Sequence, residues 1–172
     1  ERQILNNWKA FAGIFQKGER KGAPMKLNQV QANSLCVLTT RNPNSPESER
    51  YIFAVFLVDE TYEGDLHEAG YVSTKSEYKI KLSPKEANKL LFWNYHVNDN
   101  KPESISWKSG LHRYFGDEQA AQILRDIALA KKGTKDAELA NRFYNHFCLI
   151  NKINIEKLPA PNGALKRVYT KS

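Results

Sequence analysis

The order of hydrophobic and polar positions divides the chain into helical, extended and irregular stretches. Near the start, apolar side chains recur at the spacing of one helix face, which predicts a helix that ends at Gly18. The side chains that define this face are Ile4, Trp8, Phe11 and Phe15. Three stretches rich in apolar and β-branched residues predict strands at 35–40, 51–59 and 71–82.

The strand at 51–59 is apolar nearly throughout, so we expect it to be covered on both faces. In the strand at 71–82, Tyr78, Ile80 and Leu82 alternate with charged residues, which indicates one solvent-facing side. Polar stretches that contain proline or glycine predict loops at 41–50 and 60–70.

The second half of the chain is mainly helical in pattern. Ser83, Pro84 and Glu86 form the sequence of a capping box with proline at the first helical position, which predicts a short helix through Leu91. A brief strand is expected at 105–107. Apolar side chains at helical spacing then predict two longer helices, at 118–132 and 136–150.

Strands are grouped in the middle of the chain and helices at its ends, and this segregation predicts an α+β fold. We expect a small bent β-sheet or open barrel with an N-terminal helix and a C-terminal helical hairpin. The expected organisation is one domain over 1–155, with a barrel-like core at about 24–115, the hairpin at 117–150 and a basic tail or linker at 156–172.

Charge is distributed unevenly along the 172 residues, whose 26 Lys+Arg and 19 Asp+Glu give a net charge of +7. Residues 1–30 and 151–172 contribute +4 each, whereas residues 31–150 have a net charge of −1. Basic ends on a nearly neutral body point to a polyanionic partner, DNA or RNA. The longest apolar run is far shorter than the roughly 20 residues that span a bilayer, so no membrane partner is expected.

The cysteines, the histidines and the absence of common motifs limit the chemistry that the chain can carry out. Cys36 and Cys148 lie in apolar patterns and are expected to be buried free thiols, as in a reducing, cytoplasmic compartment. The chain has no nucleotide-binding, zinc-protease or hydrolase motif and no two histidines at ligand spacing, so we predict no metal site and no cofactor. Because the chain does not begin with Met, we expect it to be a piece of a longer protein with further domains.

Aromatic residues gather in one region of the sequence. Trp93, Tyr95 and Trp107 lie close together with Asn94 and Ser109 beside them. Aromatic rings that stack on a base, with an amide or hydroxyl group that reads its edge, form a nucleobase pocket. The alternative is that both tryptophans belong to the core, where most large aromatic side chains lie.

Basic residues near this region are candidates for phosphate contacts, although most lysines of a protein are simply solvated. The candidates are Lys17, Arg20, Lys21, Arg41, Lys108 and Arg113.

A second constellation fits a metal-dependent nuclease of the PD-(D/E)xK type. Such enzymes place an Asp at the end of one strand and a Glu-x-Lys on the next, where the carboxylates bind Mg²⁺. Asp59 follows the most apolar strand, and Glu77 and Lys79 lie on the next one. The alternative is a charged surface on a strand with one wet face.

The middle of the chain resembles the PUA-like superfamily, in its EVE, ASCH and YTH branches. The resemblance lies in the segments Ser34–Arg41, Tyr51–Asp59 and Tyr78–Leu82, covers about residues 24–115, and leaves the hairpin at 117–150 outside. It implies a small bent β-barrel that binds RNA or DNA, with Trp93, Tyr95 and Trp107 as candidates for an aromatic cage around a modified base. The superfamily has no single catalytic set, so the resemblance implies no catalytic residue.

The sequence therefore leads first to a nucleic-acid-binding module that recognises a base, modified or unmodified, within a larger restriction, defence or nucleic-acid-processing protein. Two alternatives stay open. One is the Mg²⁺-dependent nuclease with Asp59, Glu77 and Lys79, and the other is a protein-interaction domain whose aromatic residues form a partner surface or core.

Overall fold

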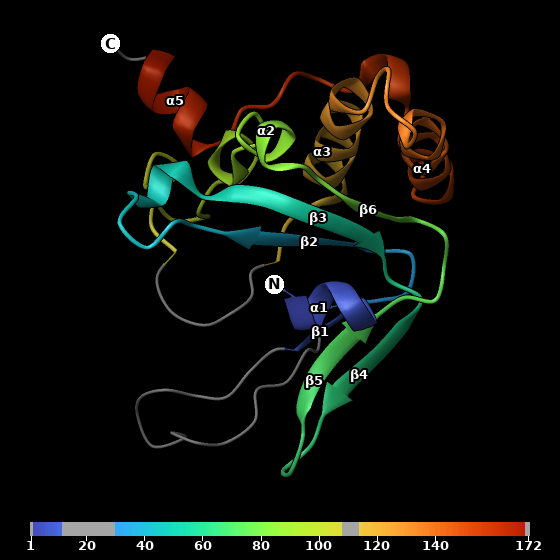
Figure 1. The fold of residues 1–172 in the computed structure, drawn as a ribbon. Coiled ribbons are helices and arrows are strands. Elements are labelled where there is room, and N and C mark those ends of the chain that lie inside the picture. Colours follow the sequence, from blue (N-terminus) through green and yellow to red (C-terminus); the bar gives the residue numbers. More distant parts are fainter. Residues whose placement is uncertain (1, 12–29, 108–113, 171–172) are drawn as a thin grey trace. The chain divides into compact units, whose positions relative to one another are not determined.

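A computed structural model describes residues 2–11, 30–107 and 114–170. The fold is α+β, as the segregated pattern predicted, with two small antiparallel three-stranded sheets and no closed barrel among these residues (Figure 1). The sequence predicted one domain over 1–155, but the chain separates into two compact units. The described residues are 2–11, 30–36, 56–79 and 114 in unit 1, and 37–55, 80–107 and 115–170 in unit 2.

One sheet, of strand order β1-β5-β4, belongs to unit 1. Its strands are β1 (Lys9–Phe11), β4 (Glu60–Gly64) and β5 (Ala69–Ser73). The first helix, α1 (Arg2–Asn7), ends at Trp8, whose φ of 49° directs the chain into β1. The predicted N-terminal helix is therefore too long, because the backbone of β1 pairs with β5 instead of continuing helical hydrogen bonds.

The stretch 60–70, expected to be a loop, is instead the β4–β5 hairpin. Its residues did not predict a strand, because Glu60, Thr61 and Glu63 are exposed on β4, which lies at the sheet edge. An edge strand can be polar on both faces without losing buried apolar contacts.

The other sheet has the strand order β2-β3-β6. Its strands are β2 (Leu35–Thr40), β3 (Tyr51–Leu57) and β6 (Lys79–Lys81). Strand β3 lies in the centre and is buried from its second residue to its last, which explains its nearly continuous apolar sequence. The predicted strand at 71–82 is two strands in different sheets, β5 and β6.

The capping box predicted at Ser83 is confirmed. Ser83 Oγ accepts a hydrogen bond from the Glu86 backbone N–H, and the Glu86 carboxylate accepts one from the Ser83 N–H at 2.8 Å. The helix that it begins, α2 (Pro84–Ala87), is shorter than predicted. The buried ammonium of Lys131 then donates to the Glu86 carboxylate at 2.8 Å, which connects α2 to the end of the next helix.

The two longer helices are present within a few residues of their predicted bounds, as α3 (Asp117–Ala130) and α4 (Ala137–Ile150). They contact one another, and the predicted apolar stripes supply buried side chains to this contact region. The fully buried members include Ile123, Ile127, Phe143 and Phe147. Residues 105–107, a predicted strand, have no regular secondary structure.

The segment expected to be a tail at 156–172 is packed into unit 2 as far as it is described. The 3-10 helix η3 (Ile155–Lys157) overlaps its start, and helix α5 (Ala164–Thr170) lies near its end. The backbone N–H of Gly163 donates to Asn94 O at 2.8 Å, and that of Ala164 donates to His96 O at 2.9 Å. Ala164 is 0% exposed. This part of the chain is therefore a structural element and not a tail.

Both cysteines are free thiols, Cys148 buried and Cys36 half-buried. None of the helices within the described ranges combines the length and the apolar character needed to cross a bilayer.

Gly163 offers a test of the packed C-terminal segment. A Cβ at this position would lie 2.4 Å from Trp93 O and from the Asn94 carbonyl carbon, which are backbone atoms that cannot rotate away. We expect Gly163→Ala to lower the free energy of unfolding by about 3 kcal/mol, measured by urea denaturation. The control is Gly116→Ala, whose Cβ would meet only the end of the flexible Gln119 side chain, with an expected change below about 1 kcal/mol. Equal effects of the two substitutions would contradict the close packing at Gly163.

Candidate functional site

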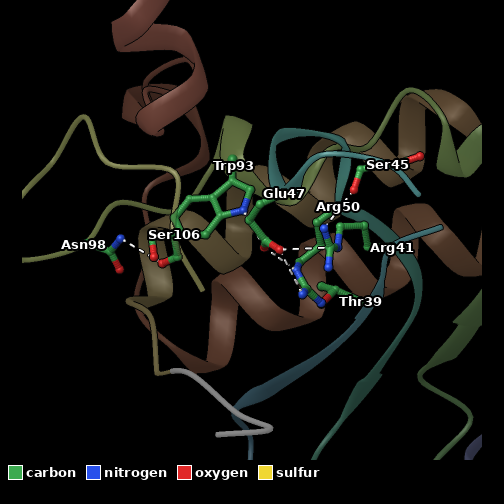
Figure 2. A network of polar contacts seen from close by, with 8 residues as sticks. All are labelled: Thr39, Arg41, Ser45, Glu47, Arg50, Trp93, Asn98 and Ser106. Atoms are coloured by element: carbon green, nitrogen blue, oxygen red, sulfur yellow. Dashed lines mark hydrogen bonds and ion pairs between the residues drawn. The ribbon is translucent and has the colours of Figure 1, made fainter. Parts of the chain in front are cut away.

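The carboxylate of Glu47 is the centre of a polar cluster in unit 2 (Figure 2). Glu47 begins the 3-10 helix η1 (Glu47–Glu49), and its Oε1 accepts from Arg50 Nε at 2.6 Å and from Trp93 Nε1 at 3.0 Å. Its Oε2 accepts from Arg50 Nη2 at 3.2 Å and lies 3.6 Å from Arg41 Nε. One carboxylate therefore connects two guanidinium groups and an indole. We call Thr39, Arg41, Glu47, Arg50, Trp93 and Trp107 the Glu47 cluster.

Arg50 is fixed by groups of three different kinds. Besides its two hydrogen bonds to Glu47, its Nη1 donates to Thr39 Oγ1 at 3.3 Å. Its guanidinium carbon lies 4.1 Å from the centroid of the Trp107 ring, within cation–π distance. Only arginine combines a planar fork for a carboxylate with a flat face for an indole, so lysine could not replace it here.

The backbone around β3 places the members of this cluster. Phe92 N donates to Arg50 O at 2.8 Å, and Ile52 N donates to Leu90 O at 2.9 Å. These two bonds join the start of β3 to the short 3-10 helix η2 (Phe92–Asn94). The indole of Trp93 is thereby brought to the carboxylate of Glu47, 46 positions earlier in the chain.

The two indoles of the cluster pack against the ring of Phe92. The ring of Phe92 lies 5.4 Å from that of Trp93, 5.0 Å from that of His96 and 5.5 Å from that of Trp107. Phe92, Trp93 and His96 are buried, whereas Trp107 is only half-buried. Trp107 is thus the ring of this group that reaches the surface.

The backbone just before Trp107 is fixed by Asn98. Its side-chain amide donates to Ser104 O at 3.1 Å and to Ser106 O at 3.2 Å, and Figure 2 shows Asn98 beside Ser106. An amide that bridges two carbonyls in this way holds an irregular segment in one conformation.

The cluster has a net positive charge. Partial burial opposes ionisation of Glu47, but hydrogen bonds from Arg50 and Trp93 and the charges of Arg50 and Arg41 outweigh it and lower the pKa of the carboxyl. Glu47 is therefore ionised at neutral pH and balances one of the two arginines. The side chain of Arg41 is 40% exposed and donates to Ser45 O at 2.8 Å, so the uncompensated charge lies at the surface.

The residues predicted to bind a base differ in their exposure to solvent. Trp93 is 0% exposed with its indole N–H bound to Glu47, and Tyr95 is buried with its hydroxyl donating to Asp126 Oδ2 at 2.6 Å. Burial, followed by this hydrogen bond, raises the pKa of Tyr95. Neither ring presents a face to solvent in this structure. Asn94 is half-buried, Trp107 is at the surface, and Ser109 lies outside the described residues.

Among the predicted phosphate contacts, Arg41 is the one whose place the structure describes, and it belongs to the Glu47 cluster. The others fall outside the described ranges: Lys17, Arg20, Lys21, Lys108 and Arg113.

The three residues of the nuclease alternative, Asp59, Glu77 and Lys79, all lie in unit 1. Asp59 Oδ2 accepts from Lys75 N at 2.8 Å and from Ser76 N at 3.1 Å, so this carboxylate holds the turn after β5. Lys79 Nζ lies 6.0 Å from the centroid of the Trp8 ring, and Glu77 O accepts from Lys79 N. Over the described ranges, no three His, Cys, Asp or Glu residues are grouped so that they could bind a metal ion. The nuclease alternative needs only two carboxylates and a lysine, so it stays a prediction.

Sequence reasoning missed Glu47 and Arg50 because both lie in the stretch treated as the loop 41–50. Their spacing of three positions immediately before a buried strand was the available signal, since such a pair can form an ion pair within one turn. The local spacing could not indicate that Trp93, 46 positions further along the chain, also binds Glu47.

Unit 2 also has a cavity of about 290 Å³, with Tyr95, Gln119, Gln122 and Arg167 among its lining residues. Its polar groups bind the chain itself, since Gln122 Nε2 donates to Pro159 O at 3.3 Å and Arg167 Nε to Asn162 O at 3.0 Å. These contacts connect α3 and α5 to the segment between η3 and α5.

No family model, no curated protein and no solved structure matches this chain.

The role of Glu47 can be tested through stability. We expect Glu47→Gln to lower the free energy of unfolding by about 2 kcal/mol at pH 7, because the amide has no negative charge and only one of the two oxygens that accept from Arg50. Because the folded-state pKa is lowered, this contribution is fully present above the ordinary glutamate pKa of about 4.3 and disappears as the pH falls below it. Urea unfolding from pH 7 to pH 3 should therefore show the difference from the wild-type protein shrinking.

The matched control is Glu49→Gln on the same turn, where the side chain is exposed and a change within about 0.5 kcal/mol is expected. A difference at Glu47 that stays constant from pH 7 to pH 3 would contradict the assigned ionisation.

Proposed function

We propose that this protein binds nucleic acid through the Glu47 cluster of unit 2, with Trp107 contacting a base and Arg41 contacting a phosphate. The supporting observation is that a half-exposed indole and an exposed guanidinium are joined through one rigid set of contacts, Arg50 and Glu47. Aromatic rings and arginine planes stack on bases, and guanidinium groups bind phosphate oxygens through paired hydrogen bonds.

Charge favours a polyanion over other ligands at this site. The cluster holds two arginines against one carboxylate, and the whole chain has a net charge of +7. A positive surface attracts phosphate without reading sequence, whereas the indole supplies a contact that needs an unstacked base. We therefore infer that the preferred ligand is single-stranded or has a base turned out of its stack.

The three segments that resemble the PUA-like superfamily contribute the strands of one sheet, β2, β3 and β6. This grouping supports the proposal that the sheet β2-β3-β6 is part of a PUA-like module, although a closed barrel is not formed by the described residues. The proposal extends to recognition of a modified base in DNA or RNA and to a place in a larger restriction or processing protein of the cytoplasm.

Trp93 and Tyr95 take a different part in this proposal from the one that their sequence suggested. Trp93 is a positioning residue, because its indole N–H orients the carboxylate that binds both arginines. Tyr95 connects η2 to α3 through Asp126. Trp107 replaces both as the ring offered to a base.

The test is binding of fluorescent oligonucleotides, single- and double-stranded DNA and RNA, with and without a methylated base, at several salt concentrations. We expect Trp107→Leu to weaken the best ligand about 10-fold, in the range of one lost stacking contact. We expect Arg41→Gln to weaken all ligands alike and to reduce the slope of log affinity against log salt by about 1.

The matched control for the lost charge is Lys85→Gln, an exposed position on α2 of the same unit that lies outside the cluster. Equal losses in Arg41→Gln and Lys85→Gln would reduce the effect to general charge and contradict the site. Absence of binding at low salt to every oligonucleotide would remove the proposed function itself.

A further inference from the structure

Three aromatic rings form a row across the sheet of unit 1. In the antiparallel register, Phe11 of β1 lies opposite Tyr71 of β5, and Tyr62 of β4 lies opposite the same Tyr71. The ring centroids are 5.8 Å apart for Phe11 and Tyr71 and 5.4 Å apart for Tyr62 and Tyr71. We call these three residues the aromatic row.

The aromatic row is partly exposed to solvent. Side chains alternate between the two faces of a strand, so Val72, next to Tyr71, points to the opposite side, where it is buried. Phe11 is 51% exposed, and Tyr62 and Tyr71 are half-exposed. Aromatic residues are enriched where proteins bind partners, so a group of rings at a surface is a candidate interaction site.

Carboxylates surround the two tyrosines. Tyr71 donates its hydroxyl to Glu60 at 3.1 Å, and Tyr62 donates its hydroxyl to Asp65 at 2.7 Å. The hydrogen bond to Asp65 is the main cause that raises the pKa of Tyr62 to about 12, and the charge of Glu68 acts in the same direction. Residues 59–68 contain five carboxylates and neither lysine nor arginine.

The ammonium group of Lys9 already contacts the rings on this face. The ammonium of Lys9 lies 3.6 Å from the centroid of the Tyr71 ring and 5.1 Å from that of Phe11. Lys9 lies two residues before Phe11 on β1, so both side chains are on the same face. Its pairing partner on β5 is Ser73, which pairs with Glu60 on the other side. The chain's own lysine therefore shows how an ammonium or guanidinium group fits between these rings and carboxylates.

We propose that the aromatic row, with Glu60, Asp65 and Glu68, is a docking surface for a lysine- or arginine-rich peptide segment of a partner protein. The rings attract cations through their faces, and the surrounding carboxylates provide charge complementary to such a segment. The same carboxylates repel phosphates, so nucleic acid is disfavoured here even though its bases stack on aromatic rings. This surface belongs to unit 1 and does not depend on the nucleic-acid binding proposed for unit 2.

The test uses the full chain and a fluorescent peptide in which six arginines alternate with glycine, with fluorescence anisotropy as the readout at low salt. We expect the double variant Glu60→Gln, Asp65→Asn to weaken binding about 10-fold and Tyr71→Leu about 3-fold. We expect Lys9→Gln to strengthen binding about 3-fold, because the peptide no longer competes with the resident ammonium.

Glu63→Gln is the matched control, because this exposed carboxylate is also on β4 but points to the face opposite Tyr62. Binding that is unchanged by Glu63→Gln supports the docking surface, with folding of each variant checked by circular dichroism. Three results would overturn it: no binding of the peptide, weaker binding in Lys9→Gln, or a loss in Glu63→Gln as large as that in Glu60→Gln, Asp65→Asn. Tighter binding of a single-stranded oligonucleotide than of the peptide, lost in Tyr71→Leu, would assign this face to nucleic acid instead.

Discussion

The ionised carboxylate of Glu47 is the constraint on which the order of unit 2 around β3 depends. It balances one of two arginines, and it is the acceptor for the indole N–H of Trp93, a fully buried side chain. Without it, the buried indole N–H of Trp93 would lose its acceptor and the largely buried guanidinium of Arg50 its counter-charge, which is costly in a protein interior. The surface position of Trp107 follows from it as well, since Arg50 is held by Glu47 and lies against the Trp107 ring.

The elements that could be predicted are those whose formation depends on a local pattern. Strand β3 and helices α3 and α4 bury a continuous run or a stripe of apolar side chains, and such patterns are legible in one sequence. The capping box at Ser83 is equally local, because its two hydrogen bonds lie within four residues. The β4–β5 hairpin and the segment packed around Gly163 were missed because polar edge strands and a glycine pressed against distant backbone leave no periodic signal.

The same division applies to the candidate site. Aromatic and basic residue types drew attention to Trp107 and Arg41, and both belong to the cluster that supports the proposed function. Residue type alone did not separate Trp107 from Trp93, since burial is decided by contacts such as that with Glu47. The contact between Lys9 and Tyr71 could not be predicted for a related reason. The two residues are brought together by the pairing of β1 with β5, which lie about 60 positions apart, and the residues of β1 were expected to be helical.

Gly163 and Ala164 donate hydrogen bonds to the carbonyls of Asn94 and His96. The folded part of unit 2 therefore includes residues well beyond α4. Helix α4 looks like a natural boundary, and a fragment cut shortly after it would keep every long helix and strand. Such a fragment would nevertheless leave two backbone acceptors beside Trp93 without their donors and would uncover the surface now buried by Leu158 and Ala164. A recombinant fragment intended to contain unit 2 should therefore extend through α5, because Gly163 and Ala164 bind the backbone next to η2.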